Sequence, residues 1–157
     1  MAYLPPQDTV ILQIPKSGSS SLINAASTLG ELTHQGHLPA SEHPPASRII
    51  AVTRDPIDRM LSALNYYYKP GDVDEVLRHA LRYRVGQAAF KPQEWYMDCD
   101  GIEAYPIDHM QDALSSIGYA GDVPKENASQ KWLTLCVASR SRYWPRLLQA
   151  CNLGTYH

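Results

Sequence analysis

Along this chain, segments with the length and composition of strands alternate with segments whose apolar residues have helical spacing. Short apolar runs over 10–14 and 48–53 have the length and β-branched content of buried strands, and weaker strand-like runs follow over 92–96 and 102–107. Helical spacing is found over 21–29, from Pro56 onward, and over 73–84, 109–117 and 143–151. Alternation of this kind predicts an α/β fold, a three-layer domain with a central parallel sheet.

The junction of the first strand and first helix, ILQIPKSGSSSL, is the most informative stretch. Pro15 ends the strand, Lys16 follows, and the serines of 19–21 offer caps for the helix. Such a loop directs backbone N–H groups and the positive end of a helix dipole toward one point, which suits a multiply charged anion. The lysine precedes the glycine, so the loop lacks the spacing of a triphosphate-binding loop.

The second informative stretch is RDPIDRMLSALNYYY, directly after the strand 48–53. Asp55 is expected to cap a helix that begins at Pro56, which places Arg54 at the strand tip and Ser62 about two turns into the helix. Arg59 is expected to pair with Asp55 on the helix surface, and a role as a ligand of the cofactor is the alternative. Because ligands bind beyond the carboxyl ends of parallel strands, Lys16 and the Arg54/Ser62 pair would face one crevice if the two strands are neighbours in the sheet. Two anionic groups on one ligand would fit this arrangement.

The length, net charge and cysteine content of the chain limit the classes of protein to which it can belong. At 157 residues the chain is expected to form a single domain over 1–157, and a net charge of −2 gives the whole chain no basic field for nucleic acid or a membrane. Three widely spaced cysteines indicate reduced thiols, and the first residues do not resemble a signal peptide. We therefore expect a soluble, cytoplasmic protein.

Both motifs resemble those of a known enzyme family. PKSGSSSL is similar to the 5′-phosphosulfate loop of sulfotransferases, and VTRDPIDRMLSAL resembles their 3′-phosphate motif, in which an Arg and a Ser eight residues later bind the phosphate. GHLPAS and DVPKENAS resemble the carbohydrate-sulfotransferase branch. The chain is shorter than typical members. The resemblance implies a P-loop-like phosphosulfate-binding loop and transfer of a sulfuryl group from 3′-phosphoadenosine 5′-phosphosulfate to a hydroxyl acceptor, a saccharide.

The resemblance also implies roles for individual residues. Lys16 would neutralise charge on the leaving phosphate, and Arg54 with Ser62 would bind the 3′-phosphate. The 5′-phosphosulfate would be held by the loop residues Ser17, Gly18, Ser19, Ser20 and Ser21. The product would be adenosine 3′,5′-bisphosphate, and no metal is required in this scheme. Because carbohydrate sulfotransferases of the Golgi are membrane-anchored, a bacterial or viral origin is expected here.

A general base is still needed for the acceptor hydroxyl. His37 is the first candidate, since it lies in GHLPAS and an imidazole titrates near neutral pH, while His34 and Glu31 are alternatives. A three-histidine metal site that also includes His43 is a weaker reading of the same segment. Two other functions stay open: a small kinase-like nucleotide phosphotransferase, and a nucleotide-binding module without catalysis.

Overall fold

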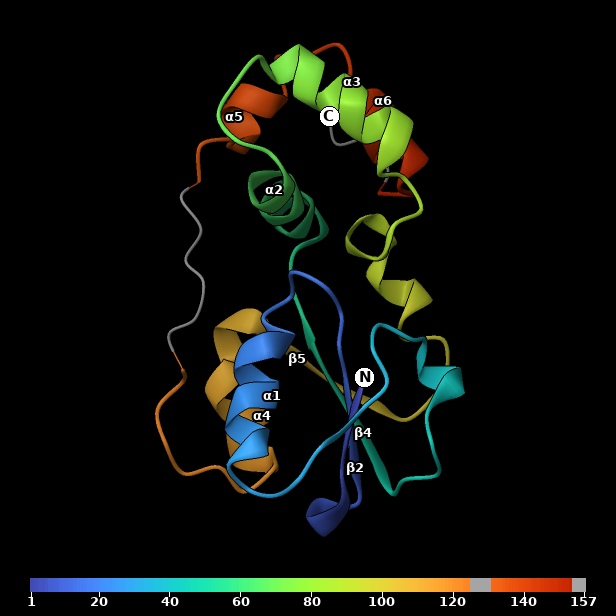
Figure 1. Ribbon diagram of the computed structural model, residues 1–157, viewed down its shortest axis with the longest axis vertical. Coiled ribbons are helices and arrows are strands. Elements are labelled where there is room, and N and C mark those ends of the chain that lie inside the picture. The colour runs from blue at the N-terminus through green and yellow to red at the C-terminus, as the bar shows by residue number, and fades with distance from the viewer. Residues whose placement is uncertain (125–130, 154–157) are drawn as a thin grey trace. The chain divides into compact units, whose positions relative to one another are not determined.

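The computed structural model describes residues 1–124 and 131–153, and the chain divides into two compact units (Figure 1). Unit 1 comprises Met1–Arg54 and Gln93–Asn127, and unit 2 comprises Asp55–Pro92 and Ala128–His157. Each unit therefore combines two separate stretches of the chain. The single-domain organisation over 1–157 stays a prediction.

Unit 1 is built on a five-stranded mixed sheet with the strand order β3-β1-β2-β4-β5. The strands are β1 (Ala2–Leu4), β2 (Thr9–Leu12), β3 (Thr33–His34), β4 (Arg48–Thr53) and β5 (Ile102–Pro106). The core β2-β4-β5 is parallel as predicted, but β1 pairs antiparallel with both β2 and β3. The prediction of a fully parallel sheet is therefore wrong. The short turn η1 (Pro5–Gln7) between β1 and β2 explains this, because so short a connection can join only antiparallel neighbours.

The two faces of this sheet are covered differently. Side chains of Ile11, Ile50 and Val52 pack against α1 (Ser19–Ser27) and α4 (Met110–Ser116), which lie together on one face (Figure 1). The alternate residues of β2 and β4 face the other way and pack with Ala40 and Tyr96.

Segments that carry 3-10 turns, rather than α-helices, form this other layer. They contain η2 (Ala40–Glu42) and η4 (Gln93–Trp95), while η5 (Ile107–His109) leads from β5 into α4. The strand predicted over 92–96 is wrong, since the Tyr96 N–H donates to the Gln93 carbonyl and closes a turn there (2.8 Å).

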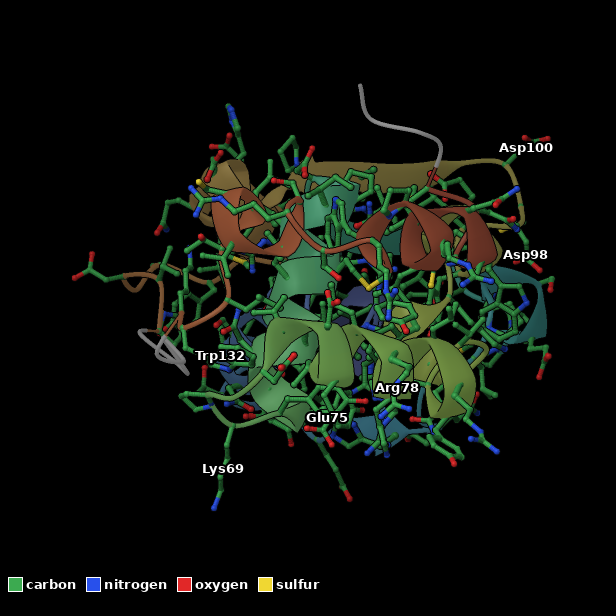
Figure 2. The ribbon with its side chains drawn as sticks, turned by 90° about the horizontal axis from the view of Figure 1, so that it is seen from above. Lys69, Glu75, Arg78, Asp98, Asp100 and Trp132 are labelled. Atoms are coloured by element: carbon green, nitrogen blue, oxygen red, sulfur yellow. The ribbon has the colours of Figure 1, made fainter. Side chains whose placement is uncertain are left out.

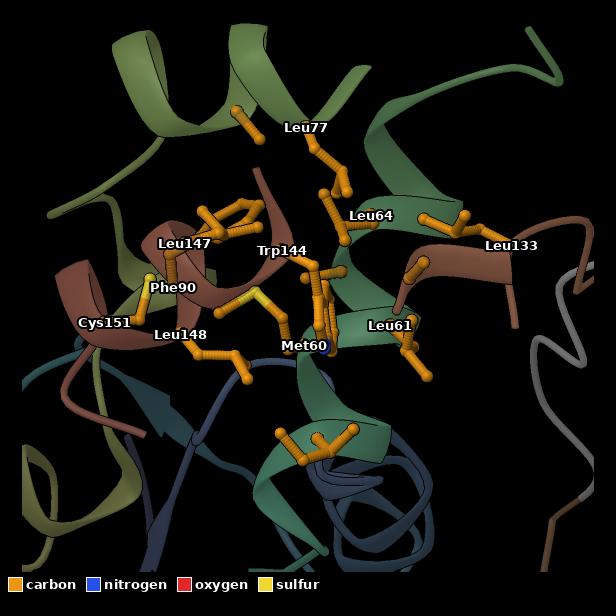
Figure 3. Packing of buried hydrophobic residues seen from close by; sticks show 14 of the residues in the cluster. Met60, Leu61, Leu64, Leu77, Phe90, Leu133, Trp144, Leu147, Leu148 and Cys151 are labelled. Atoms are coloured by element: carbon orange, nitrogen blue, oxygen red, sulfur yellow. The ribbon is translucent and has the colours of Figure 1, made fainter. Parts of the chain in front are cut away.

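Unit 2 is helical in its described part. Its elements are α2 (Pro56–Tyr67), α3 (Val73–Tyr83), η3 (Ala88–Phe90), α5 (Leu135–Ala138) and α6 (Trp144–Ala150). The helix predicted from Pro56 onward is confirmed as α2, and its Met60, Leu61 and Leu64 are buried together with Trp144 in the helical core of unit 2 (Figure 3). In the ranges 1–124 and 131–153, no helix has both the length and the apolar character needed to cross a membrane.

Candidate functional site

The loop between β2 and α1 contains two residues with positive φ, one on each side of Ser17, and both favour a tight turn. Lys16 has φ 65° and Gly18 has φ 95°, both in the left-handed region. A side chain at Gly18 would come within 3.0 Å of Met110 and 3.1 Å of Ile107, so only glycine fits without displacement. Gly18 is also the N-cap of α1, without a side-chain hydrogen bond, so the expected serine cap is wrong.

The serines of this loop divide into two groups. Ser17 and Ser19 are buried, and both hydroxyls donate to the carbonyl oxygen of Ile14, at 2.8 and 3.0 Å. These two hydroxyls therefore hold the loop in shape. Ser20 is exposed and Ser21 is half-buried. The first N–H groups of α1, from Ser19 and Ser20, have no acceptor within the helix and supply its partial positive charge.

Two cations from distant parts of the sequence come together beside this helix end. β2 and β4 are parallel neighbours with Leu12 opposite Ala51, so Lys16 and Arg54 both follow the same edge of the sheet. Burial lowers the pKa of Lys16, and the nearby positive charge of Arg54 lowers it further. Among the residues that the structure describes, no carboxylate forms an ion pair with the Arg54 guanidinium. Two adjacent cations at a helix N-terminus are the donor set that an anion requires.

Gln93 fixes the backbone of Arg54. Its side-chain Oε1 accepts from the Arg54 N–H at 2.9 Å, and its Nε2 donates to the Arg54 carbonyl at 2.7 Å. Gln93 is only 8% exposed, so both bonds are shielded from water. Sequence reasoning missed this residue, because nothing in the segment PQEW distinguishes a buried clamp from a surface glutamine.

His37 is held beside the same loop. Its Nδ1 lies 2.6 Å from the carbonyl oxygen of Gln13, three residues before Lys16. A carbonyl oxygen can only accept, so Nδ1 carries the proton and, in the neutral ring, Nε2 carries the lone pair. The side chain is exposed, as a base that receives a proton from an outside hydroxyl must be. The alternatives Glu31 and His34 are also exposed, and His34 lies in β3.

Two predicted residues on α2 belong to unit 2. Ser62 is half-buried, and its partnership with Arg54 stays a prediction. Arg59 is not on the surface as expected, because it is 1% exposed and donates to the carbonyl oxygens of Ala89 and Lys91. Asp55 instead accepts from two backbone N–H groups at the start of α2, so the surface Asp55/Arg59 pair is wrong.

Further predictions concern the loops. Within the described ranges, no three His, Cys, Asp or Glu side chains are grouped as metal ligands. Most of the fragment DVPKENAS, residues 125–129, lies outside the described residues. All three cysteines are free thiols.

Comparison of the chain with family models, with curated proteins and with solved structures finds no match.

Proposed function

We propose that unit 1 binds 3′-phosphoadenosine 5′-phosphosulfate and that the protein is a sulfotransferase whose acceptor is a hydroxyl group of a saccharide. The observation that supports this most strongly is the position of Lys16 and Arg54 after the neighbouring parallel strands β2 and β4, together with the lowered pKa of Lys16, to which the charge of Arg54 contributes after burial. Two cations beside a helix N-terminus, with no carboxylate of the described residues paired to Arg54, favour a ligand with two anionic groups over one with a single charge.

The residues present fit this cofactor by the chemistry of their donors. The P-loop-like segment at 15–21 offers the N–H groups at the start of α1 and the Lys16 ammonium for the 5′-phosphosulfate. Arg54 offers a planar guanidinium for the 3′-phosphate, and Gln93 fixes the backbone from which that guanidinium extends. When bound, the cofactor would supply an activated sulfuryl group.

The chain itself would then contribute two catalytic functions. The Nε2 lone pair of His37 would take the proton from the attacking hydroxyl, and the hydrogen bond from Nδ1 to Gln13 would stabilise the resulting imidazolium. Lys16 would neutralise the negative charge that grows on the departing phosphate oxygen, an interaction stronger in the transition state than in the ground state. Direct in-line displacement needs no further group from the protein.

A thermal melt tests the proposal. Adenosine 3′,5′-bisphosphate at about a hundred times its dissociation constant should add about 2.7 kcal/mol to the free energy of unfolding and raise the melting temperature without magnesium. ATP with magnesium serves as the comparison. A shift with ATP and magnesium alone would favour a phosphotransferase. Absence of any shift with the bisphosphate, for a folded sample, would refute the proposal.

Turnover separates the enzyme from a non-catalytic module. The protein is incubated with sulfate-labelled cofactor and a panel of saccharide acceptors, and labelled product is expected. His37→Gln should retain bisphosphate binding while losing on the order of 100-fold or more in rate, as expected for loss of a general base. Bisphosphate binding without any labelled product across the panel would indicate a binding module.

A further inference from the structure

The charge of the chain is divided unequally between the units. Unit 2 contains ten of the fourteen Lys and Arg residues but only five of the sixteen Asp and Glu residues, which gives it a formal net charge of +5. Unit 1 accordingly carries −7. The near-neutral total therefore conceals a basic unit, and the total charge alone does not exclude nucleic acid as a partner of this chain.

Part of this positive charge alternates with aromatic rings across α3 and the end of α2. We name these residues the ring–guanidinium band: Tyr67, Tyr68, Arg78, His79, Arg82, Tyr83 and Arg84. His79 lies at its centre, since its Nδ1 is 2.9 Å from the Tyr68 hydroxyl and its ring centroid is 4.6 Å from that of Tyr83.

Guanidinium groups cover the rings at both ends of the band. The Arg82 guanidinium lies 5.2 Å from the Tyr83 ring centroid, and the Arg84 guanidinium lies 4.6 Å from that of Tyr67. These are distances at which cation–π attraction holds a guanidinium over a ring. Arg82 and Arg84 are therefore positioned by rings of the same surface.

The band is accessible to a large ligand. Tyr83 is 53% exposed, and Arg78, His79 and Arg82 are all exposed. A surface hollow of about 210 Å³ is lined by Arg78, His79, Arg82 and Tyr83, with Glu75 as the acidic lining residue among those that the structure describes. Figure 2 labels Glu75 and Arg78, which both extend from α3. Arg78 and Arg82 are one helical turn apart, about 6 Å along the axis, so they can contact successive anionic groups of one strand.

We propose that the ring–guanidinium band of unit 2 binds single-stranded nucleic acid. Phosphates would pair with Arg78 and with Arg82, whose guanidinium would leave the Tyr83 ring, and an unpaired base would take its place on that exposed ring. Sequence-tolerant single-strand binders use this combination of phosphate pairing and base stacking. A duplex presents no free base face to such a ring. An acidic polysaccharide offers charge, but its sugar rings have no π system with which guanidinium and tyrosine planes can stack.

Fluorescence anisotropy with labelled oligo(dT) of about 16 nucleotides tests this inference on the full chain. The logarithm of affinity should fall with the logarithm of salt concentration, with a slope of about −0.7 for each phosphate contact. Removing both arginines in Arg78→Ala/Arg82→Ala should reduce that slope by about 1.4 and weaken binding by about tenfold or more. Tyr83→Leu should weaken binding by about 5- to 100-fold through lost stacking.

The matched control is Arg140→Ala/Arg146→Ala, which removes the same charge from two exposed positions of unit 2 outside the band. This control should retain affinity within about threefold, because neither arginine lines the hollow formed by Arg78, His79, Arg82 and Tyr83. The melting temperature of each variant verifies that it folds. The response to adenosine 3′,5′-bisphosphate should be unchanged in the band variants, so this inference and the proposed function can fail separately.

Four outcomes would overturn the inference. The first is no binding of the oligonucleotide, and the second is equal affinity for a duplex of the same length. The third is equal loss in the control variant, which would assign binding to the overall charge of unit 2. The fourth is equally tight binding of heparin together with no effect of Tyr83→Leu, which would identify a site for acidic polysaccharides.

Discussion

Arg54 and Arg59 are close in sequence but belong to different units, and their surroundings differ in a way that distinguishes two uses of arginine. Arg59 is buried in unit 2, where backbone carbonyl oxygens accept its hydrogen bonds. Arg54 in unit 1 is half-buried, and its charge acts on another cation, Lys16. An arginine whose donors face carbonyl oxygens inside a core stabilises the fold. An arginine placed beside a second cation is available to an anion.

The largest effect that would test this comparison concerns Arg59. Arg59→Ala should reduce the free energy of unfolding by about 3–5 kcal/mol, because it leaves a cavity and removes the donors to the Ala89 and Lys91 carbonyls. Denaturant unfolding monitored by tryptophan fluorescence measures the change, since Trp144 lies in the same core. The matched control, Arg78→Ala, replaces an exposed arginine on α3 and should change stability by less than about 0.5 kcal/mol. Equal effects of the two variants would contradict the structural role of Arg59.

A smaller effect is expected from the two side-chain amides that clamp backbone segments. Gln93 clamps Arg54 in unit 1, and Asn65 clamps Leu133 in unit 2, donating to its carbonyl at 2.8 Å and accepting from its N–H at 2.9 Å. Gln93→Leu and Asn65→Leu should each cost about 1–3 kcal/mol, because backbone groups lose their partners. Only Gln93→Leu should also weaken bisphosphate binding, by about tenfold, since it releases the backbone of Arg54. Calorimetric titration of both variants measures this difference, and equal bisphosphate affinities would refute a positioning role for Gln93.

The smallest effect is a response of unit 1 to acid. Hydrogen bonds from serine and arginine partners lower the pKa of Asp8, Asp98 and Glu103 below their ordinary values of 3.8 and 4.5. A carboxyl group whose pKa is lower in the folded state than in the unfolded state stabilises the folded state at any pH above its ordinary pKa. This stabilisation is lost as the pH falls through the lowered, folded-state pKa. All three are surface groups, so the change should be modest. The denaturant midpoint should decrease between pH 5 and pH 2, and Asp98→Asn should show a shallower decrease. An identical dependence of the denaturant midpoint on pH in Asp98→Asn would contradict a contribution of the Asp98 carboxylate to stability.

Much of the parallel core could be predicted from sequence because its signals are local. The run 48–53 coincides with β4, and the helix from Pro56 begins where proline and its acidic cap require. The sequence does not predict β1, because three residues are too few to show an alternation of apolar and polar positions. These residues form a strand through their pairing with β2. The strand expected over 92–96 is a 3-10 turn, since short apolar runs do not distinguish the two.

The candidate site was predictable only in part. Residue type and position alone predict Lys16, Arg54 and His37 as site residues, and their roles stay predictions. The structure adds the hydrogen bond that fixes the His37 tautomer. The clamp by Gln93 and the burial of Arg59 depend on contacts over about thirty residues or more, which no local pattern encodes. The charge division between units could have been found in the sequence only if their boundaries had been known.

The central claim is that Lys16 and Arg54 form one site for a ligand with two anionic groups. It is tested most directly by calorimetric affinities of wild type and Arg54→Ala for adenosine 3′,5′-bisphosphate and for adenosine 5′-monophosphate, which lacks the 3′-phosphate. Wild type should prefer the bisphosphate by about 10- to 100-fold, the value of a charge-assisted hydrogen-bonded contact, and Arg54→Ala should lose that preference while its monophosphate affinity changes little. A preference that persists in Arg54→Ala, or equal affinity of wild type for both nucleotides, would contradict the claim.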